Sequence, residues 1–338
     1  MRNLFGLPLR RLRIYAAPFE RPADSFKLSP QASCVGPKWI GLERNLTVIE
    51  ETIPFWIPTS KDYRSLLWQY FRGPTVAIDQ NVCVLIDHLN TKPNYFHWFL
   101  DALPRIFAAE VYQRLSGEPF SALVPEGLQS WQSDSLLFLG IHPEQWIQVP
   151  TTSSIRSWSF ERLVSTFSHR HIRHSETGHF DALSPHAVAM LSSRLIAGME
   201  RHKKATPDTT CRRLYISRGK ATQRRVRNED AVLAFLSLHG FQGVQLDGLP
   251  LHQQIQLFQG ATHIISAHGG ALTNLLYISP GCQVLEIFQS GHGLRPDFFQ
   301  LTALRGGLYS FSEATSLNLN HDIEIPFAVL RTFLEASL

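Results

Sequence analysis

Short apolar runs alternate with amphipathic stretches in the second half of the chain. The apolar runs predict strands at 213–217, 244–246, 263–266 and 284–288. The stretches between them predict helices at 228–240, 251–258 and 271–277, the first of which begins after Asn228 and ends at Gly240. Because strands that alternate with helices are joined by right-handed crossovers, this half is expected to form a parallel sheet.

The first half has shorter and less regular apolar runs. They predict strands at 76–78, 82–86, 122–124 and 146–149, with a turn at 79–81. Helical spacing predicts helices at 96–115, where Pro104 should kink or restart the helix, and at 131–139. A polar, His-rich stretch at 168–179 is expected to be a loop connecting two halves, and a helix at 185–199 follows it. The expected organisation is α/β, with domains at 1–180 and 181–338.

Polar residues and glycines end three predicted strands of the second half. These strand-end segments are Ser217-Arg218, 266–270 and 286–288. Because carboxyl ends of parallel strands meet at one edge of a sheet, these segments are expected to converge. Gly269 and Gly270 would let a ligand approach the backbone, the amides of the next helix would hold a phosphate, and His268 would donate a further hydrogen bond. The alternative is a tight turn whose glycines only relieve steric conflict.

Other polar side chains near these strand ends could complete an anion site. Of the basic residues Arg218, Lys220 and Arg224, we expect Arg218 first, because an arginine binds phosphate bidentately from a strand end. The alternative is a solvated basic surface. Glu286 could accept two ribose hydroxyls, or could pair with an arginine. Asn274 could face the phosphates or be an inert polar residue.

A histidine and an aspartate lie four residues apart in the predicted helix of the first half. On a helix His97 and Asp101 share a face, so Asp101 could orient His97 as a general base. A structural pair is the alternative. The sequence offers no third ligand beside this pair, and the spacing of the 168–179 histidines matches no standard zinc motif. We therefore expect no metal.

The composition narrows the class of protein. The 338 residues are 44% hydrophobic and 18% charged, and the net charge of +4 does not suggest a nucleic-acid binder. Cys34, Cys83, Cys211 and Cys282 are far apart, so we expect reduced, buried thiols. No apolar run is long enough to span a membrane, which favours a cytoplasmic protein. The basic, amphipathic segment 1–13 could contact an anionic membrane surface or be an exposed arm.

Three blocks of sequence together resemble glycosyltransferase family 61, which includes EGF-domain and dystroglycan N-acetylglucosaminyltransferases, plant xylan-decorating enzymes and many bacterial proteins. The blocks are Asn94–Trp98 with Asp101 and 103–105, then 214–218 with 227–229, then 266–274 through 280–281 to 284–287. The third block has His268-Gly269-Gly270-Ala271 where the family typically has His-Gly-Ala.

The resemblance implies an inverting glycosyltransferase of the GT-B type, with two Rossmann-like domains facing across a cleft. The second domain would hold a nucleotide-sugar donor, UDP-sugar being favoured, and the first would face a glycan or protein acceptor. His97 or Asp101 would act in catalysis, and Asn94 and Trp98 would contact the acceptor. Activity would need no metal and no cofactor, and the product would belong to polysaccharide biosynthesis. Two alternatives stay open: another nucleotide-binding α/β enzyme, and a non-catalytic scaffold that binds glycan or protein partners.

Overall fold

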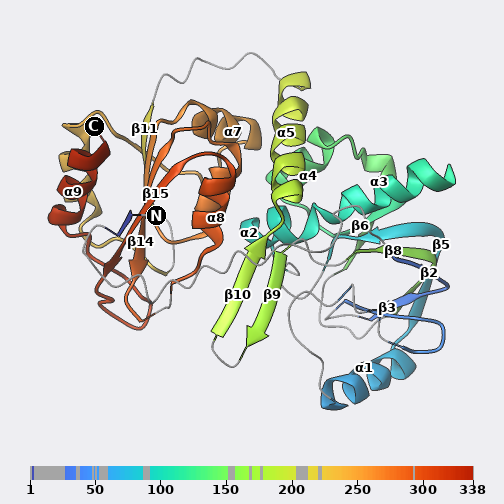
Figure 1. Ribbon diagram of the computed structural model, residues 1–338. Helices are drawn as coiled ribbons and strands as arrows, with labels where there is room; N and C mark the ends of the chain where they lie inside the picture. Colours follow the sequence, from blue (N-terminus) through green and yellow to red (C-terminus); the bar gives the residue numbers. More distant parts are fainter. Residues whose placement is uncertain are drawn as a thin grey trace. The chain divides into compact units, whose positions relative to one another are not determined.

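A computed structural model describes residues 2–3, 27–35, 39–47, 49, 52, 60–86, 92–150, 157–166, 170–175, 178–202, 212–219, 223–291 and 294–337. The chain forms two compact units (Figure 1). The N-terminal unit is Ala17–Leu191, and the C-terminal unit is Ser192–Leu338 with Met1–Ala16. Each unit has its own sheet flanked by helices, which confirms the α/β class and is consistent with two Rossmann-like domains of the GT-B type.

The sheet of the N-terminal unit is mixed and has seven strands in the described residues. They are β2 (Lys27–Pro30), β3 (Ser33–Val35), β4 (Ile40–Leu42), β5 (Thr75–Val84), β6 (Ser121–Pro125), β7 (Trp146–Val149) and β8 (Ser157–Ser165). The order is β4-β3-β8-β5-β6-β7, and β2 also pairs with β8. The strands β8, β5, β6 and β7 run parallel, whereas β2, β3 and β4 add antiparallel partners at one side.

The described helical segments of the N-terminal unit connect the strands of this sheet. They are α1 (Ser60–Arg72), α2 (Tyr95–His97), the π-helix η3 (Trp98–Ala102), α3 (Arg105–Ser116), α4 (Ser130–Phe138) and the 3-10 turn η4 (Pro143–Gln145). α3 contacts β5 and β8, while Leu66 of α1 packs on Val35, Ile40 and Leu42. Helix α5 (Pro185–Arg201) contains the division between the two units.

The sheet of the C-terminal unit is parallel throughout its described strands. They are β1 (Arg2–Asn3), β11 (Arg213–Ile216), β12 (Gln242–Val244), β13 (His263–Ala267), β14 (Gln283–Gln289) and β15 (Leu308–Ala314), in the order β1-β15-β14-β13-β11-β12. From β11 the chain moves outward to β12 and then crosses back to β13. The order therefore reverses between β11 and β13, and such a switch point is where doubly wound sheets bind ligands.

Helices cover both faces of this second sheet. They are α6 (Glu229–Ser237), α7 (Leu251–Gly260), the 3-10 helix η5 (Gly270–Tyr277), α8 (Asp297–Leu304) and α9 (Phe327–Ser337). α6 and α9 share one apolar core with the strands, and α7 and α8 both contact η5. Figure 1 shows α8 and α9 on opposite sides of β14 and β15. Right-handed crossovers produce this arrangement, because reversing direction at the switch point changes the face that the helices cover.

Several expectations from the sequence are wrong in a physically instructive way. Residues 79–81 form no turn: β5 continues through them, and its register with β8 shifts by one residue between Ile78 and Asn81. Such a bulge accommodates polar residues that interrupt an apolar strand. The expected loop at 168–179 contains instead a two-stranded antiparallel ribbon of β9 (Arg170–Ser175) and β10 (Gly178–Leu183). Backbone pairing alone can define such a ribbon, so a polar composition does not exclude it.

The helix expected at 96–115 is broken where Pro104 predicts a restart. Pro104 precedes α3, and the turn before it is a π-helix in which Leu103 N donates to Trp98 O at 2.9 Å. A proline has no N–H and its ring conflicts with the carbonyl four residues earlier, so a wider turn relieves that conflict. The helix expected at 271–277 is the 3-10 helix η5. The strand expected at 244–246 ends at Val244.

Three of the four cysteines lie in the described residues. Cys34, Cys83 and Cys282 are buried thiols, as expected, and burial raises the pKa of each to about 12. Cys211 lies outside the described residues. None of the helices in the described ranges is both long and apolar enough to cross a bilayer.

Candidate functional site

The carboxyl edge of the C-terminal sheet brings two of the predicted segments together at the switch point. Arg218 follows β11 and Gly269 follows β13. The guanidinium of Arg218 fills the space beside Gly269 so closely that a Cβ at residue 269 would lie 2.0 Å from Arg218 Nη1. A side chain at residue 269 would therefore displace the guanidinium. Around Gly270, by contrast, a Cβ would meet no atom within 4 Å, so the backbone there is open to a ligand.

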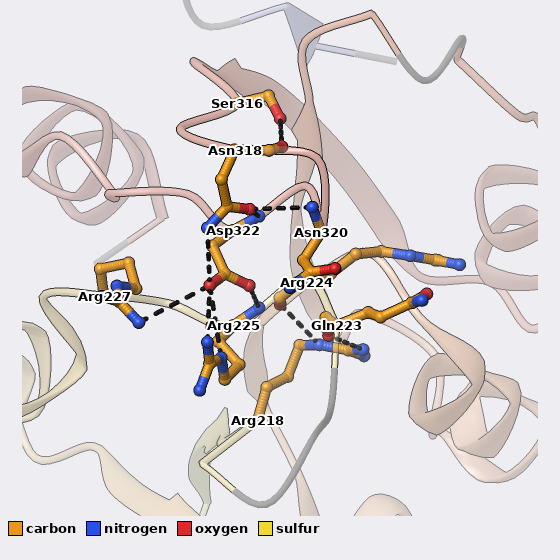
Figure 2. A network of polar contacts seen from close by, with 9 residues as sticks. All are labelled: Arg218, Gln223, Arg224, Arg225, Arg227, Ser316, Asn318, Asn320 and Asp322. Carbon is orange, nitrogen blue, oxygen red and sulfur yellow. Dashed lines mark hydrogen bonds and ion pairs between the residues drawn. The ribbon is translucent and has the colours of Figure 1, made fainter.

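Backbone carbonyls hold the Arg218 side chain in place. Its Nε donates to Arg224 O at 3.0 Å and its Nη2 to Gln223 O at 3.2 Å (Figure 2). Its backbone N–H donates to Glu229 Oε1 at 3.0 Å, which fixes the chain at the end of β11. A guanidinium whose orientation is set by carbonyls loses less side-chain entropy when it binds an anion.

Positive charge accumulates around Arg218. Burial and the charge of Arg224 lower the pKa of Arg218, and the carboxylates of Asp247 and Glu229 offset part of this effect. Burial and the charge of Arg295 lower the pKa of Arg224. Arg295 lies between β14 and α8, in the segment after the next strand of the sheet. Cations that destabilise one another are stabilised by an anion, so the three arginines favour a phosphate-bearing ligand at this edge.

His268 is held by a buried carboxylate. His268 Nδ1 and Glu286 Oε1 lie 2.5 Å apart, and the Tyr309 hydroxyl donates to the other oxygen of Glu286. Glu286 is fully buried in the middle of β14, and burial and its charge raise the pKa of Tyr309 well above the ordinary value. Both oxygens of Glu286 are engaged inside the protein, and its carboxylate supports His268 in this structure. The ribose contact considered from the sequence is not made by these oxygens as they are placed here.

Asn274 and Lys220 are the other two predicted donor residues. Asn274 is buried, and its amide donates to Gln254 Oε1 and to Ala271 O, both at 3.1 Å. The contact with Gln254 ties η5 to α7. Lys220 lies outside the described residues.

Asp322 stabilises the segment that positions Arg218. The fully buried carboxylate accepts from Arg225 N at 2.9 Å, from Arg225 Nη2 at 3.1 Å and from Asn318 Nδ2 at 3.1 Å, and Arg227 Nη1 lies 3.7 Å away (Figure 2). Arg224 N also donates to Asn320 O. The loop at 316–322 thus fixes residues 223–227, whose carbonyls hold Arg218. The sequence gives no sign of this pairing, because its partners lie 97 residues apart.

Replacing Asp322 with asparagine is expected to lower the thermal unfolding midpoint by several degrees. The backbone N–H of Arg225, and then the Asn318 amide and the Arg225 side chain, lower the pKa of Asp322 from its ordinary 3.8 to about 2. The carboxylate therefore stabilises the folded state fully above pH 3.8, and this contribution is lost as the pH falls through about 2. Thermal melts of both proteins from pH 7 to pH 2 would measure it. Equal midpoints at pH 7 would contradict the assignment, and the difference should shrink at the acid end.

In the N-terminal unit, His97 and Asp101 form the predicted pair. His97 Nδ1 lies 2.6 Å from Asp101 Oδ2, with 19% of the His97 side chain exposed and Asp101 buried. If the carboxylate accepts Nδ1–H, the tautomer that remains presents a lone pair at Nε2. The π-helix that carries Asp101 is a kind of turn that occurs often at functional sites. This geometry suits a general base.

The two residues expected to contact the acceptor have structural roles here. Asn94 is the N-cap of α2, and its Oδ1 accepts from His97 N at 3.3 Å. Trp98 is completely buried, and its indole N–H donates to Ser135 Oγ at 2.9 Å. Asn94 remains exposed and therefore accessible to a ligand, whereas Trp98 is part of the core that supports His97.

Sequence reasoning missed Arg295, Tyr309 and Asp322. Tyr309 lies on β15, the neighbour of β14, and the pairing of Glu286 with Phe311 places the two strands side by side. Had residues 308–314 been predicted as the next strand of the parallel sheet, Tyr309 would have been expected near Glu286. Among the described residues, no group of three His, Cys, Asp or Glu side chains is arranged to hold a metal ion.

A comparison with protein-family models identifies the family of the chain. The model of glycosyltransferase 61 matches residues 95–285, more than half of the 338-residue chain. The match includes His97, Arg218 and His268, and thus covers the candidate residues of both units. A search of curated proteins returned no match. The chain belongs to glycosyltransferase family 61 and is a glycosyltransferase.

Proposed function

We propose that the protein is an inverting glycosyltransferase that moves a sugar from a nucleoside diphosphate donor to a hydroxyl group of a glycan or protein acceptor. Family membership implies a donor and an acceptor. The donor domain is the one expected at 181–338, which corresponds to the C-terminal unit. The acceptor domain is the one expected at 1–180, which corresponds to the N-terminal unit except that residues 1–16 join the C-terminal unit. UDP-sugar is the favoured donor, and the reaction belongs to polysaccharide biosynthesis in the cytoplasm, where the basic segment 1–13 could contact a membrane surface.

One observation carries the donor assignment: the Arg218 guanidinium lies on Gly269 at the switch point between β11 and β13. A diphosphate bound there would meet Arg218, the open backbone at Gly270 and the amides at the start of η5. His268, held at Nδ1 by Glu286, would donate a further hydrogen bond from Nε2 when its ring carries both protons. Arg224 and Arg295 add positive charge that favours the diphosphate as it leaves.

The proposed catalytic base is His97. In the transfer step, the acceptor oxygen forms a bond to the anomeric carbon as the bond between that carbon and the phosphate oxygen breaks. The proton of the acceptor hydroxyl moves to His97 Nε2, while Asp101 holds Nδ1–H and stabilises the imidazolium that forms. The electron pair of the broken bond leaves with the nucleoside diphosphate. Attack from the face opposite the leaving group inverts the anomeric configuration.

The test is a turnover assay with the full chain. UDP- and GDP-sugars would be incubated with a mixture of hydroxyl acceptors, the released nucleoside diphosphate measured, and the anomeric configuration of the product read by NMR. We expect one donor to be consumed and its configuration to be inverted. Retention would contradict the mechanism. Binding of a nucleoside diphosphate without turnover would favour the scaffold, and binding of NAD alone would favour another α/β enzyme.

Turnover is also expected to be unchanged by EDTA. Three arginines and the first turn of η5 can neutralise the departing diphosphate without a divalent cation. The same assay, run after dialysis against EDTA and again after addition of manganese or magnesium, measures this. Loss of turnover in EDTA that manganese restores would contradict the proposal.

A further inference from the structure

The outward face of α1 has an unusual composition for a surface helix. Two of its exposed side chains are aromatic: Trp68 is 50% exposed and Phe71 is 69% exposed. Outward faces of surface helices usually carry polar and charged residues, and aromatic rings are usually covered. Figure 1 shows α1 at one margin of the N-terminal unit, beside β3. Both rings are therefore open to a partner outside the chain.

The inward face of α1 already has its partners. Leu66 is buried in the apolar cluster that α1 forms with β3 and β4, and Leu67 and Tyr70 are partly buried against that cluster. Because successive residues of a helix are rotated by about 100°, Trp68 lies on the side opposite Leu66. The inward face is enough to hold the helix on the sheet, so Trp68 and Phe71 are not needed for its packing.

Two arginines share the outward face with the rings. Arg64 lies one turn before Trp68 and Arg72 lies one turn after it, so the three residues form a stripe along the helix. Both arginines are exposed, and the guanidinium carbon of Arg72 lies 5.2 Å from the centre of the Trp68 ring. Within the described part of the chain, neither arginine is in an ion pair. Their charges are available to an outside anion.

The four side chains Arg64, Trp68, Phe71 and Arg72 are called the α1 face, and its shape suits a flat partner. The stripe from Arg64 to Arg72 is about 12 Å long, because a helix rises about 1.5 Å per residue. A helix surface is convex, whereas small-molecule sites are concave. All four side chains reach the same depth when the helix axis lies parallel to a flat surface. This geometry favours a surface over a small ligand.

An anionic lipid bilayer has the chemistry that matches this face. Aromatic rings are favoured at the boundary between headgroups and acyl chains, and arginines pair with lipid phosphates and are attracted to a negative membrane surface. An acidic protein could also pair with the arginines. A stable protein interface, however, uses about 20–30 residues a side, far more than the four of the α1 face. A bilayer accepts individual side chains, so it is the partner that so small a face favours.

We propose that the α1 face docks the N-terminal unit on an anionic lipid surface, with Trp68 and Phe71 at the headgroup level and Arg64 and Arg72 on lipid phosphates. The contact is interfacial, since α1 has 13 residues and a membrane-spanning helix needs about 20. The α1 face is separate from segment 1–13, which belongs to the C-terminal unit. The inference goes beyond the proposed function and does not depend on it, because no residue of the α1 face takes part in the proposed reaction.

The test measures binding of the full chain to lipid vesicles by co-sedimentation. The vesicles are pure phosphatidylcholine, or phosphatidylcholine with one third phosphatidylglycerol. We expect binding to the anionic vesicles to be at least tenfold tighter and to weaken as salt is added. Trp68→Ala combined with Phe71→Ala should weaken this binding at least tenfold. Arg64→Gln combined with Arg72→Gln should remove the preference for phosphatidylglycerol.

The matched control is Arg114→Gln combined with Leu115→Ala. This variant removes one cation and one exposed apolar side chain from the end of α3, in the same unit, and should bind the anionic vesicles like the wild type. All of the substituted side chains are exposed, so each variant is expected to fold. Thermal melts and UDP affinity would confirm this for each preparation, because the proposed donor residues belong to the other unit.

The other outcomes identify a different partner or contact. Equal binding to both kinds of vesicle would overturn the proposal, and so would folded variants of the α1 face that bind anionic vesicles normally. Polyglutamate that binds as tightly as the anionic vesicles would indicate an acidic protein instead. Self-association that the Trp68 and Phe71 substitutions abolish would indicate a second copy of the chain. Failure to bind UDP, with normal binding to anionic vesicles, would reject the proposed donor site and leave the α1 face standing.

Discussion

His97→Ala is expected to lower turnover by about 10²–10⁴-fold while leaving donor affinity nearly unchanged. The imidazole lies 2.6 Å from the buried carboxylate of Asp101, an arrangement that selects the tautomer with a basic Nε2. Removing it takes away the group that receives the acceptor proton. The residues of the proposed donor site belong to the other unit, so their contacts are retained. Steady-state kinetics and nucleoside diphosphate binding on the same preparation would measure both quantities.

His142→Ala is the matched control for this variant. His142 is exposed in the same unit and contacts Gln145 through its backbone. It should retain normal turnover. The competing role for His97 and Asp101 is to fix the helical run to its neighbours. A folded His97→Ala protein with near-normal turnover would remove His97 from the mechanism, and a loss of thermal stability without the loss of turnover would establish that structural role.

Arg218→Ala is expected to weaken nucleoside diphosphate binding by ~1.5–3 kcal/mol, the range for a hydrogen bond to a charged group. That is about 10- to 150-fold in the dissociation constant. The guanidinium is held by Arg224 O and Gln223 O and lies on Gly269, so it is already oriented before the ligand arrives. Calorimetric titration of UDP into both proteins would measure the change.

Arg331→Ala removes the same charge from α9 and is the control for the Arg218 variant. Arg331 is exposed and lies over the ring of Phe235, away from the contacts of Arg218. Its loss should leave UDP affinity unchanged.

Gly269→Ala should weaken UDP binding as Arg218→Ala does, because the new Cβ would lie 2.0 Å from Arg218 Nη1 and displace the guanidinium. Unchanged UDP affinity in the Arg218 variant would reject the donor assignment.

The convergence of Arg218 and Gly269 could be predicted from the sequence because it follows from local pattern and topology. Each residue follows an apolar strand, and adjacent parallel strands place their carboxyl ends at one edge. The pairing of His97 with Asp101 was predictable for a similar reason, since both belong to one helical run. Short-range periodicity contains the information needed for both.

The roles of Glu286 and Trp98 could not be predicted in the same way. Glu286 faces His268 and Tyr309, and Tyr309 comes from a strand 23 residues later in the chain. Trp98 donates to Ser135 of another helix, 37 residues away. Whether a polar group is buried depends on partners that are distant in the sequence. A single amino-acid sequence does not show which distant residues will be those partners. The ribbon of β9 and β10 was missed because backbone hydrogen bonds, not apolar alternation, define it.

The switch point between β11 and β13 is the proposed binding site for a nucleoside diphosphate. The most direct measurement is a calorimetric titration of UDP and GDP into the wild-type protein, with NAD as the comparison. Saturable, one-to-one binding of UDP or GDP that Arg218→Ala weakens at least tenfold, with no binding of NAD, is the predicted result. Binding of NAD in place of either nucleoside diphosphate, or UDP binding that is insensitive to Arg218→Ala, would contradict it.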